Sequence, residues 1–362
     1  MASTDQKPSA PQLPGPDPEQ NPGPNPEENP GPNTEENPGP EDYPDLEVDS
    51  DETDSAYAES TRTSFMTSIA SSVTRGIFEN GRRYHSYGES QYAFPNDERE
   101  LERLDMQHTM QTMLLNGKLF WSPIGPSPQK ILDLGTGTGI WAIEMADLYP
   151  SAEVIGTDVS AIQPDWVGPN CSFEIDDAEQ DWLYGPNTFD FIHNRNFVCA
   201  IRNWERLIGQ SFLHVKPGGW VEWHEKHPQF YSDDGSLKED SAIAKWGKTF
   251  FEASEIFGTS AHSPKHLKRW MIEAGFVDVQ EHILKLPVGI WPKDKRHKNI
   301  GMFEMVNMDE GLESLSLMLF TRALKWTREE VLMFLMQVRK DAKDKSIHSY
   351  YHFYVVFGRK PE

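Results

Sequence analysis

Short apolar runs and amphipathic stretches alternate along the chain from residue 130 to residue 223. The apolar runs are rich in β-branched and aromatic residues, and they predict strands over residues 130–134, 153–157, 171–175, 189–192 and 220–223. Apolar residues at helical spacing lie between these runs, over Ile140–Tyr149 and from Trp204 to Phe212. Strands and helices in this alternation are typical of a parallel sheet with helices on both faces. The pattern therefore predicts a doubly wound α/β domain.

The pattern changes after residue 262. Ser263-Pro264 is typical of a helix N-cap and first turn. Two further strands are predicted over residues 276–286 and 350–357. Between these strands lies a long segment, residues 288–347, in which Thr327 and Glu330 form a capping box before an apolar stripe. Long segments of this kind usually carry structure of their own. We therefore predict a helical insert before the last strand.

Two different segments precede the α/β domain, which we place at residues 129–362. Residues 1–59 contain proline–glycine–acidic octads such as Asn21–Glu28, and this composition predicts a disordered tail. The tail is either solubilising or a docking segment for a partner. Residues 60–128 have a globular composition and include a predicted helix over Asp97–Leu115. On its apolar stripe lies His108, which is either a core residue or part of a ligand site.

Charge and composition exclude several classes of protein. The net charge is −23, and the first 60 residues hold 16 acidic residues against one lysine, so the rest of the chain carries −8. This acidity argues against a nucleic-acid partner, because phosphates would be repelled. There is no apolar run long enough to span a membrane and no apolar leader after Met1. The only cysteines are Cys171 and Cys199, which favours a reducing compartment, in the cytoplasm, the nucleus or both.

The strongest motif is the glycine-rich turn Asp133-Leu-Gly135-Thr-Gly137-Thr-Gly139 between the first strand and the first helix. Glycine at such a turn lets the backbone approach a ligand closely. A dinucleotide site would need glycine or alanine where Ile140 stands, and the preceding Asp133 would repel a pyrophosphate. Beside a sulfonium, or hydrogen-bonded to an amino group, that acid is favourable. The motif therefore selects a cofactor that has no phosphates but carries an amino acid and a ribose.

Acidic residues at the ends of the next two strands agree with such a cofactor. Asp158 ends the second strand, where a carboxylate can accept hydrogen bonds from both ribose hydroxyls. Asp177 and Ala178 follow the third strand, where an adenine would lie. Taken singly, Asp158 could be a turn residue and Asp177 a helix cap. Because the carboxyl ends of parallel strands share one sheet edge, their joint placement favours a binding site.

These residues resemble the class I methyltransferases, and further motifs narrow the resemblance to the LaeA-like fungal methyltransferases. The motifs that carry it are Glu79–His85, Pro95–Asp97, Leu104–His108, Ile131–Asp147, Val154–Asp158, Ile162–Pro164, Asp176–Glu179, Phe191–His193 with Arg195, and Lys216–Gly219. The resemblance covers residues 60–362 and leaves out the tail. The sequence differs from the family pattern at Trp223–His227, at the end of the predicted fifth strand.

The resemblance implies a seven-stranded sheet, S-adenosylmethionine as the methyl donor, and residues 79–108 as a cover over the cofactor. It implies Asp133, Gly135, Thr136, Gly137, Gly139, Asp158, Asp177, Ala178 and His193 as cofactor-binding residues. Methyl transfer needs positioning and, for some acceptors, removal of a proton. Histidines at strand ends suit that proton transfer, so His193 and His224 are the candidate bases, with His227 as a further one. No metal site is predicted, because Asp233-Asp234-Gly235 is first of all a turn signal.

Three functions remain open at this point. The first is an S-adenosylmethionine-dependent methyltransferase that acts on a small-molecule acceptor, such as a secondary metabolite. The second is a regulatory protein of secondary metabolism that binds the cofactor and acts through protein partners. The third, an NAD-dependent dehydrogenase, is disfavoured by the spacing of the glycines.

Overall fold

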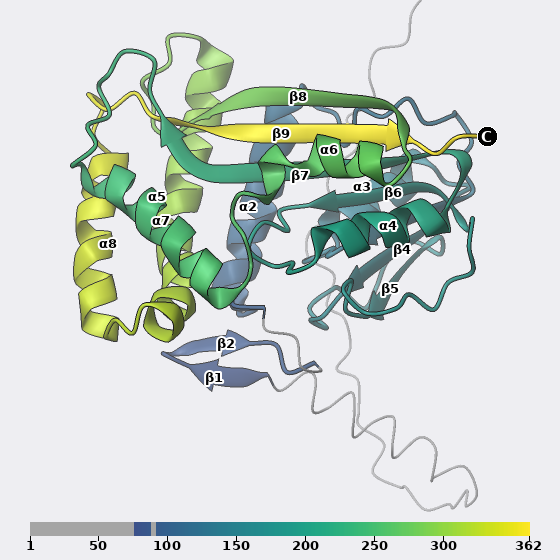
Figure 1. Ribbon diagram of the computed structural model, residues 1–362, viewed down its shortest axis with the longest axis horizontal. Helices are drawn as coiled ribbons and strands as arrows, with labels where there is room; N and C mark the ends of the chain where they lie inside the picture. The colour runs from purple at the N-terminus through teal and green to yellow at the C-terminus, as the bar shows by residue number, and fades with distance from the viewer. Residues whose placement is uncertain (1–75, 88–91) are drawn as a thin grey trace, which may run out of the picture. The chain divides into compact units, whose positions relative to one another are not determined.

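The computed structural model describes residues 76–87 and 92–362, shown in Figure 1. The predicted tail, residues 1–59, and the start of the segment that follows it lie outside the described residues. In the part of the chain that the structure describes, no helix is both long and apolar enough to cross a membrane.

A seven-stranded sheet organises the domain. Its strands are β3 (Lys130–Leu134), β4 (Glu153–Asp158), β5 (Cys171–Ile175), β6 (Phe189–Arg195), β7 (Val215–Tyr231), β8 (Val277–Pro287) and β9 (Tyr350–Arg359). They lie in the order β5-β4-β3-β6-β7-β9-β8. The first five are parallel, and β9 is antiparallel to both of its neighbours. This topology confirms the predicted doubly wound class I methyltransferase fold.

Alternate residues of the central strands supply two apolar layers, one on each face of the sheet. Ile131 and Phe191 pack with Trp141 of α3 (Ile140–Leu148) on one face. Their neighbours Leu132 and Ile192 pack on the other face, against α4 (Trp204–His214) and α6 (Leu267–Glu273). In Figure 1, α4 and α6 cross in front of the sheet. The near-continuous apolar sequence of these strands follows from burial on both faces.

The predicted insert is helical. It consists of α7 (Lys295–Ala323) and α8 (Arg328–Ala342). The capping box is confirmed: Thr327 Oγ1 accepts from the Glu330 N–H at 3.2 Å, and the Glu330 carboxylate accepts from the Thr327 N–H at 2.8 Å. Both helices pack with α5 (Ala242–Phe257) against the far ends of β7, β8 and β9, around Phe320, Leu335 and Phe353.

The segment before the sheet contains the predicted helix and an unpredicted hairpin. The helix is α2 (Glu98–Leu114), and its N-cap Asp97 accepts from the Glu100 N–H at 3.2 Å. The hairpin joins β1 (Ile77–Glu79) to β2 (Arg82–Tyr84). Asn80 and Gly81 form its turn, both with positive φ. Asn-Gly is a strong sequence signal for a two-residue hairpin turn, so the hairpin could have been predicted.

Two predictions of local structure are wrong, and one helix was missed. The strand predicted over residues 220–223 is β7, which has 17 residues, so Pro217-Gly218-Gly219 does not precede it and His224 and His227 do not follow it. Ser263 lies in a 3-10 turn, Ser263–Lys265, and does not cap α6. Helix α5 was not predicted, although Ile243, Trp246 and Phe250 lie at helical spacing after the N-cap Ser241.

Candidate functional site

A cavity lies at the carboxyl ends of β3, β4, β5 and β6, with α2 as one wall. The cavity opens to solvent, and the empty space in and in front of it amounts to about 900 Å³. The sheet side of its lining consists of Gly135–Thr138, Thr157–Val159, Asp176–Ala178, Arg195–Phe197, Ala200 and Ile201. Tyr92 and the α2 residues Leu104, Gln107, His108 and Gln111 complete it. The turn of the glycine motif, Asp158, Asp177 and Ala178 therefore meet at one cavity, as predicted from their places at strand ends.

The three glycines of the turn have different neighbours. Each has a positive φ: +62° for Gly135, +59° for Gly137 and +81° for Gly139. A Cβ on Gly135 would stand 1.9 Å from the ring of Phe197, and one on Gly139 would stand 2.4 Å from the ring of Phe173. At Gly137 the nearest atom would be 3.7 Å away, on Leu104. Gly135 and Gly139 thus make room for protein rings, and Gly137 is the glycine that leaves space for a ligand.

Asp158 joins the end of β4 to the glycine turn. Its Oδ2 accepts a hydrogen bond from the Gly137 N–H at 2.9 Å, and its Oδ1 accepts one from the Ser160 N–H at 2.9 Å. Burial raises the pKa of this carboxyl to about 6, although the two N–H groups favour the charged form. Each carboxylate oxygen can accept a second hydrogen bond. Asp158 can therefore fix the turn and still accept hydrogen bonds from ribose hydroxyls.

The residues after β5 form a turn at the same edge. Asp177 Oδ1 accepts from the Glu179 N–H at 3.0 Å, and the Asp176 N–H donates to the Asp158 carbonyl at 3.0 Å. Asp176, Asp177 and Ala178 line the cavity on the side away from β6. The adenine position predicted here stays a prediction.

Asp133 does not face the cavity. It is 2% exposed, and its carboxylate accepts from Thr136 Oγ1 at 2.7 Å and lies 2.8 Å from Nδ1 of His193. Burial raises its pKa to about 7. The arrangement does not support the predicted contact of this acid with the cofactor, which stays a prediction. Asp133 lies inside β3 and positions the glycine turn through its hydrogen bond with Thr136. Thr136 lines the cavity, whereas Asp133 does not.

The two predicted bases, His193 and His224, do not line the cavity either. His193 is fully buried, with its ring stacked on Trp141 at 3.8 Å between centroids, and burial lowers its pKa well below the usual value. His224 Nε2 lies 2.6 Å from the buried carboxylate of Glu222, which also accepts from Ser122. A base must reach the proton that it removes. Neither ring is among the residues that line the cavity, so the geometry does not support His193 and His224 as bases, and their assignment stays a prediction. His227 is likewise buried inside β7.

Comparison with known proteins identifies the family. Residues 106–281 match a family model described as a methyltransferase domain. The methyltransferase pytC of Aspergillus terreus is 42% identical over 318 residues, which cover 88% of this chain and 95% of that protein. The secondary metabolism regulator LAE1 of Cochliobolus heterostrophus is 35% identical over 78% of this chain and 94% of that protein. For the protein-methionine methyltransferase laeA of Emericella nidulans, identity is 34% over 78% of this chain and 76% of that protein.

The chain belongs to the LaeA-like methyltransferases. It is an S-adenosylmethionine-dependent methyltransferase. The residues at the sheet edge fit this cofactor, since Gly137 leaves open space beside the carboxylate of Asp158 and no phosphate has to be accommodated. The dehydrogenase alternative is thereby excluded.

This LaeA-like methyltransferase has a second set of cavity residues that the sequence analysis did not assign to the site. Arg195 and Asn196 come at the end of β6, and the side-chain oxygen of Asn196 accepts from Gln107 at 3.1 Å and from Gln111 at 2.8 Å. The carboxylate of Glu225 accepts from the N–H groups of Phe197 and Val198, each at 2.8 Å. Burial raises the pKa of Glu225 to about 8. These contacts fix the loop after β6 against α2.

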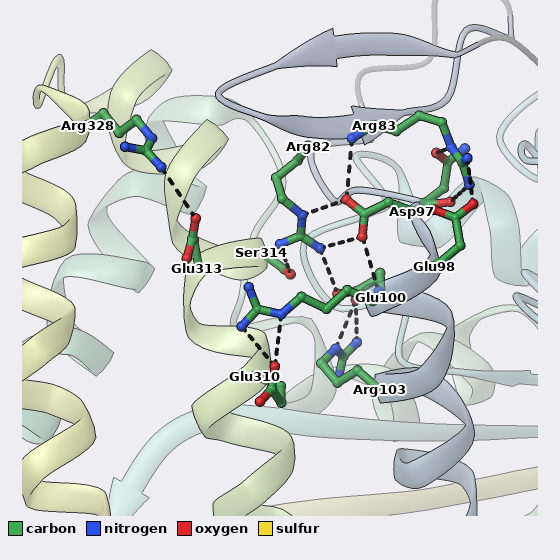
Figure 2. A network of polar contacts seen from close by, with 12 residues as sticks. Arg82, Arg83, Asp97, Glu98, Glu100, Arg103, Glu310, Glu313, Ser314 and Arg328 are labelled. Atoms are coloured by element: carbon green, nitrogen blue, oxygen red, sulfur yellow. Dashed lines mark hydrogen bonds and ion pairs between the residues drawn. The ribbon is translucent and has the colours of Figure 1, made fainter.

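A buried polar network joins α2 to the insert (Figure 2). Arg82 donates to Asp97 at 2.6 Å and to Ser314 of α7 at 2.8 Å. Arg103 donates to Glu100 at 2.6 Å. Its other contacts are Asn307 of α7 at 2.7 Å and Gln107 at 2.8 Å. The network therefore connects the insert, through Arg103 and Gln107, to a residue of the cavity lining.

The chemistry of the site follows from this arrangement. When bound, the cofactor supplies a methyl group on a sulfonium, which is already activated for displacement. The chain would contribute binding and orientation: Asp158 and Gly137 would hold the nucleoside side, with α2 as one wall of the cavity. Among the described residues that line the cavity, His108 is the only histidine.

Proposed function

We propose that this methyltransferase acts on a small-molecule acceptor. The observation that carries the proposal is the lining of the cavity, which combines apolar side chains with a few polar groups, as is usual for small-molecule sites. Tyr92, Leu104, Phe197, Ala200 and Ile201 give part of the cavity an apolar lining, which suits an apolar acceptor such as a secondary metabolite.

One relative shares almost the whole domain in which the cavity lies. The protein named methyltransferase pytC is 42% identical and is covered almost over its whole length. The similarity includes both the cofactor region and the insert, because it extends over 88% of this chain. The groups that line the cavity therefore fall within a shared domain.

Transfer of label tests the acceptor class. The protein is incubated with S-adenosylmethionine that carries a labelled methyl group, together with an extract of an organism that encodes this chain. The extract is then separated into small molecules and proteins. We expect label in the small-molecule fraction, and clearly less with the Asp158→Ala variant at a limiting cofactor concentration, which serves as the control for cofactor-dependent transfer. Label in proteins alone would contradict the proposal.

A regulatory role through protein partners is the second candidate. Relatives at 34–35% identity are named regulators of secondary metabolism. The two candidates differ in their need for the cofactor. In a strain that lacks the gene, a small-molecule enzyme requires an intact Asp158 to restore the product. Restoration of the regulated genes by Asp158→Ala would favour the partner-based role.

We also propose a location in the cytoplasm or the nucleus. Cys171 and Cys199 are both buried and free, which agrees with a reducing compartment. A fluorescent fusion followed in living cells tests this proposal.

A further inference from the structure

The guanidinium of Arg195 is a charged group at the cavity for which the described part of the chain supplies no partner. Arg195 is half-buried at the end of β6 and lines the cavity. Within residues 76–87 and 92–362 its side chain makes no hydrogen bond and no ion pair. Burial lowers its pKa. A charged group held partly away from water costs free energy unless a partner pairs with it. The charge therefore points to a ligand.

Three carboxylates lie near enough to act on Arg195 electrostatically, and each already has a partner. They belong to Asp133, Glu144 and Asp105. Asp133 is bound by Thr136 and His193, as described above. Glu144 lies 3.1 Å from Nε2 of His108, and Asp105 accepts from Thr138 Oγ1 at 2.7 Å. The donors of Arg195 thus remain free for a carboxylate from outside the protein, which a guanidinium can bind in bidentate geometry.

His108 offers the complementary group. Its ring is 3% exposed and lines the same cavity. Because Nε2 faces the carboxylate of Glu144, the ring proton belongs on Nε2, and Nδ1 carries the lone pair. Nδ1 is buried and has no hydrogen-bond partner among the described residues. Burial and the charge of Arg195 lower the pKa of His108 to about 3, so the ring stays neutral near pH 7. Nδ1 can therefore accept a hydrogen bond from an ammonium group.

The order of the strands places these two groups at one end of the cofactor. The strands run β5-β4-β3-β6, so Asp177 and Asp158 lie on one side of the glycine turn and Arg195 on the other. A cofactor whose ribose is held at Asp158 extends across Gly137 toward β6. The end opposite its adenine carries an α-carboxylate and an α-ammonium.

We propose that Arg195 and His108 bind the amino-acid end of the cofactor. The guanidinium of Arg195 pairs with the α-carboxylate, and Nδ1 of His108 accepts from the α-ammonium. Glu144 holds His108 in the required tautomer. This pair takes the role first predicted for Asp133. The inference rests on the cofactor assignment and does not depend on the acceptor proposed above.

Calorimetric titration with three nucleosides tests the site. S-adenosylhomocysteine has both groups of the amino-acid end, its decarboxylated analogue keeps only the ammonium, and 5′-methylthioadenosine has neither. We expect Arg195→Met to weaken S-adenosylhomocysteine roughly tenfold to a hundredfold, the effect of losing a hydrogen bond to a charged group. Its affinities for the other two nucleosides should stay at the wild-type level. His108→Leu should weaken both compounds that have an ammonium group and spare 5′-methylthioadenosine.

Three controls keep the outcome clear. Arg269→Met removes an exposed arginine of α6 and should change none of the titrations. His108→Asn keeps a hydrogen-bond acceptor near the position of Nδ1 and should restore most of the affinity that His108→Leu loses. Ligand-free Arg195→Met should melt no lower than the wild type, since the guanidinium has no partner in the described part of the chain.

Any of three results would overturn the proposal. The first is wild-type affinity of Arg195→Met for S-adenosylhomocysteine. The second is an equal loss of affinity for 5′-methylthioadenosine, and the third is a lower melting temperature of the ligand-free variant. The last two would mean that Arg195 supports the fold. None of these titrations uses an acceptor, so they succeed or fail independently of the acceptor class.

Discussion

The cofactor region, residues 130–201, and the insert, residues 288–347, are held in place by different kinds of contact. In the cofactor region a carboxylate at a strand end, Asp158, binds the backbone of a turn 21 residues away. In the insert, side chains of α7 bind Arg82 and Arg103 across more than 200 residues of sequence. Backbone contacts of the first kind leave a compact motif in the sequence. Contacts of the second kind leave none, because neither partner has a fixed spacing from the other.

The largest effect is expected where the insert meets α2. Arg103 is 8% exposed and holds Glu100 in a buried pair. Arg103→Met should lower the free energy of unfolding by about 3–5 kcal/mol, because it leaves a buried carboxylate short of its partner. Urea denaturation measures the change. Arg99→Met, which breaks an exposed pair with Glu310, is the matched control and should cost less than about 1 kcal/mol. Equal losses for the two variants would remove the distinction between buried and exposed pairs.

The second effect concerns the glycines of the cofactor region. Gly135→Ala should cost about 2–4 kcal/mol of folding stability, because a positive φ is strained for alanine and the new Cβ would overlap Phe197. Gly137→Ala has the same sign of φ but open space, so only the strain of about 1–2 kcal/mol should remain. Thermal denaturation of both variants measures the difference. A larger loss for Gly137→Ala would contradict the division of roles between the two glycines.

The third effect is on binding. Asp158→Ala should weaken S-adenosylhomocysteine by about tenfold or more, since hydrogen bonds to a charged group contribute roughly 1.5–3 kcal/mol. Calorimetry measures the affinity. Unchanged affinity would remove Asp158 from the cofactor site.

The role of Asp158 can also be tested through the pH dependence of cofactor affinity. The pKa of Asp158 is raised to about 6, and the ionised form is the one that accepts hydrogen bonds from ribose. Affinity should therefore fall about tenfold for each pH unit below that pKa. The sign is opposite for the folding stability of the ligand-free protein, because a raised carboxyl pKa favours the folded state at low pH and that contribution is lost as the pH rises through 6. Asp158→Asn should remove the dependence of binding on this group.

The smallest effect on folding stability is expected at the N-cap of α8, in the insert. Thr327→Ala removes the N-cap of α8 and should cost about 1 kcal/mol of folding stability, with no change in cofactor affinity. Thr327→Ser keeps the hydroxyl and should stay close to the wild type. A loss of cofactor affinity in Thr327→Ala would mean that the end of the insert controls the cavity directly.

The strands of the sheet could be predicted because burial on both faces produces continuous apolar runs. The ends of β3 and β5 were also predicted correctly, but the end of β6 was not. Strand β6 was predicted to end at Ile192 but reaches Arg195, so His193 is buried within it and Arg195 stands at the edge of the sheet. Asp133 lies inside β3 as predicted, but the direction of its side chain, toward Thr136 and His193, could not be predicted from the strand's bounds.

The length of β7 was hidden by residues that normally interrupt strands. Pro217-Gly218-Gly219 lies inside it, and the Gly218 N–H donates to the Lys360 carbonyl at 2.9 Å. Partners on both sides, β6 and β9, maintain the pairing beyond the short apolar run at residues 220–223. Those partners come from distant parts of the chain, so the local pattern could not predict them. Helix α5 and the Asn80-Gly81 hairpin, by contrast, had recognisable signals.

The position of β9 has a consequence for synthesis of the protein. Of the seven strands it is the last to leave the ribosome, yet it lies in the interior of the sheet between β7 and β8. Until it emerges, the long edges of both neighbours have no partner, and exposed edges invite pairing with other chains. We therefore expect nascent chains to depend on chaperones or on fast docking of β9. A message truncated between β8 and β9, at residues 288–349, would yield an aggregation-prone product with its glycine turn intact but its sheet incomplete.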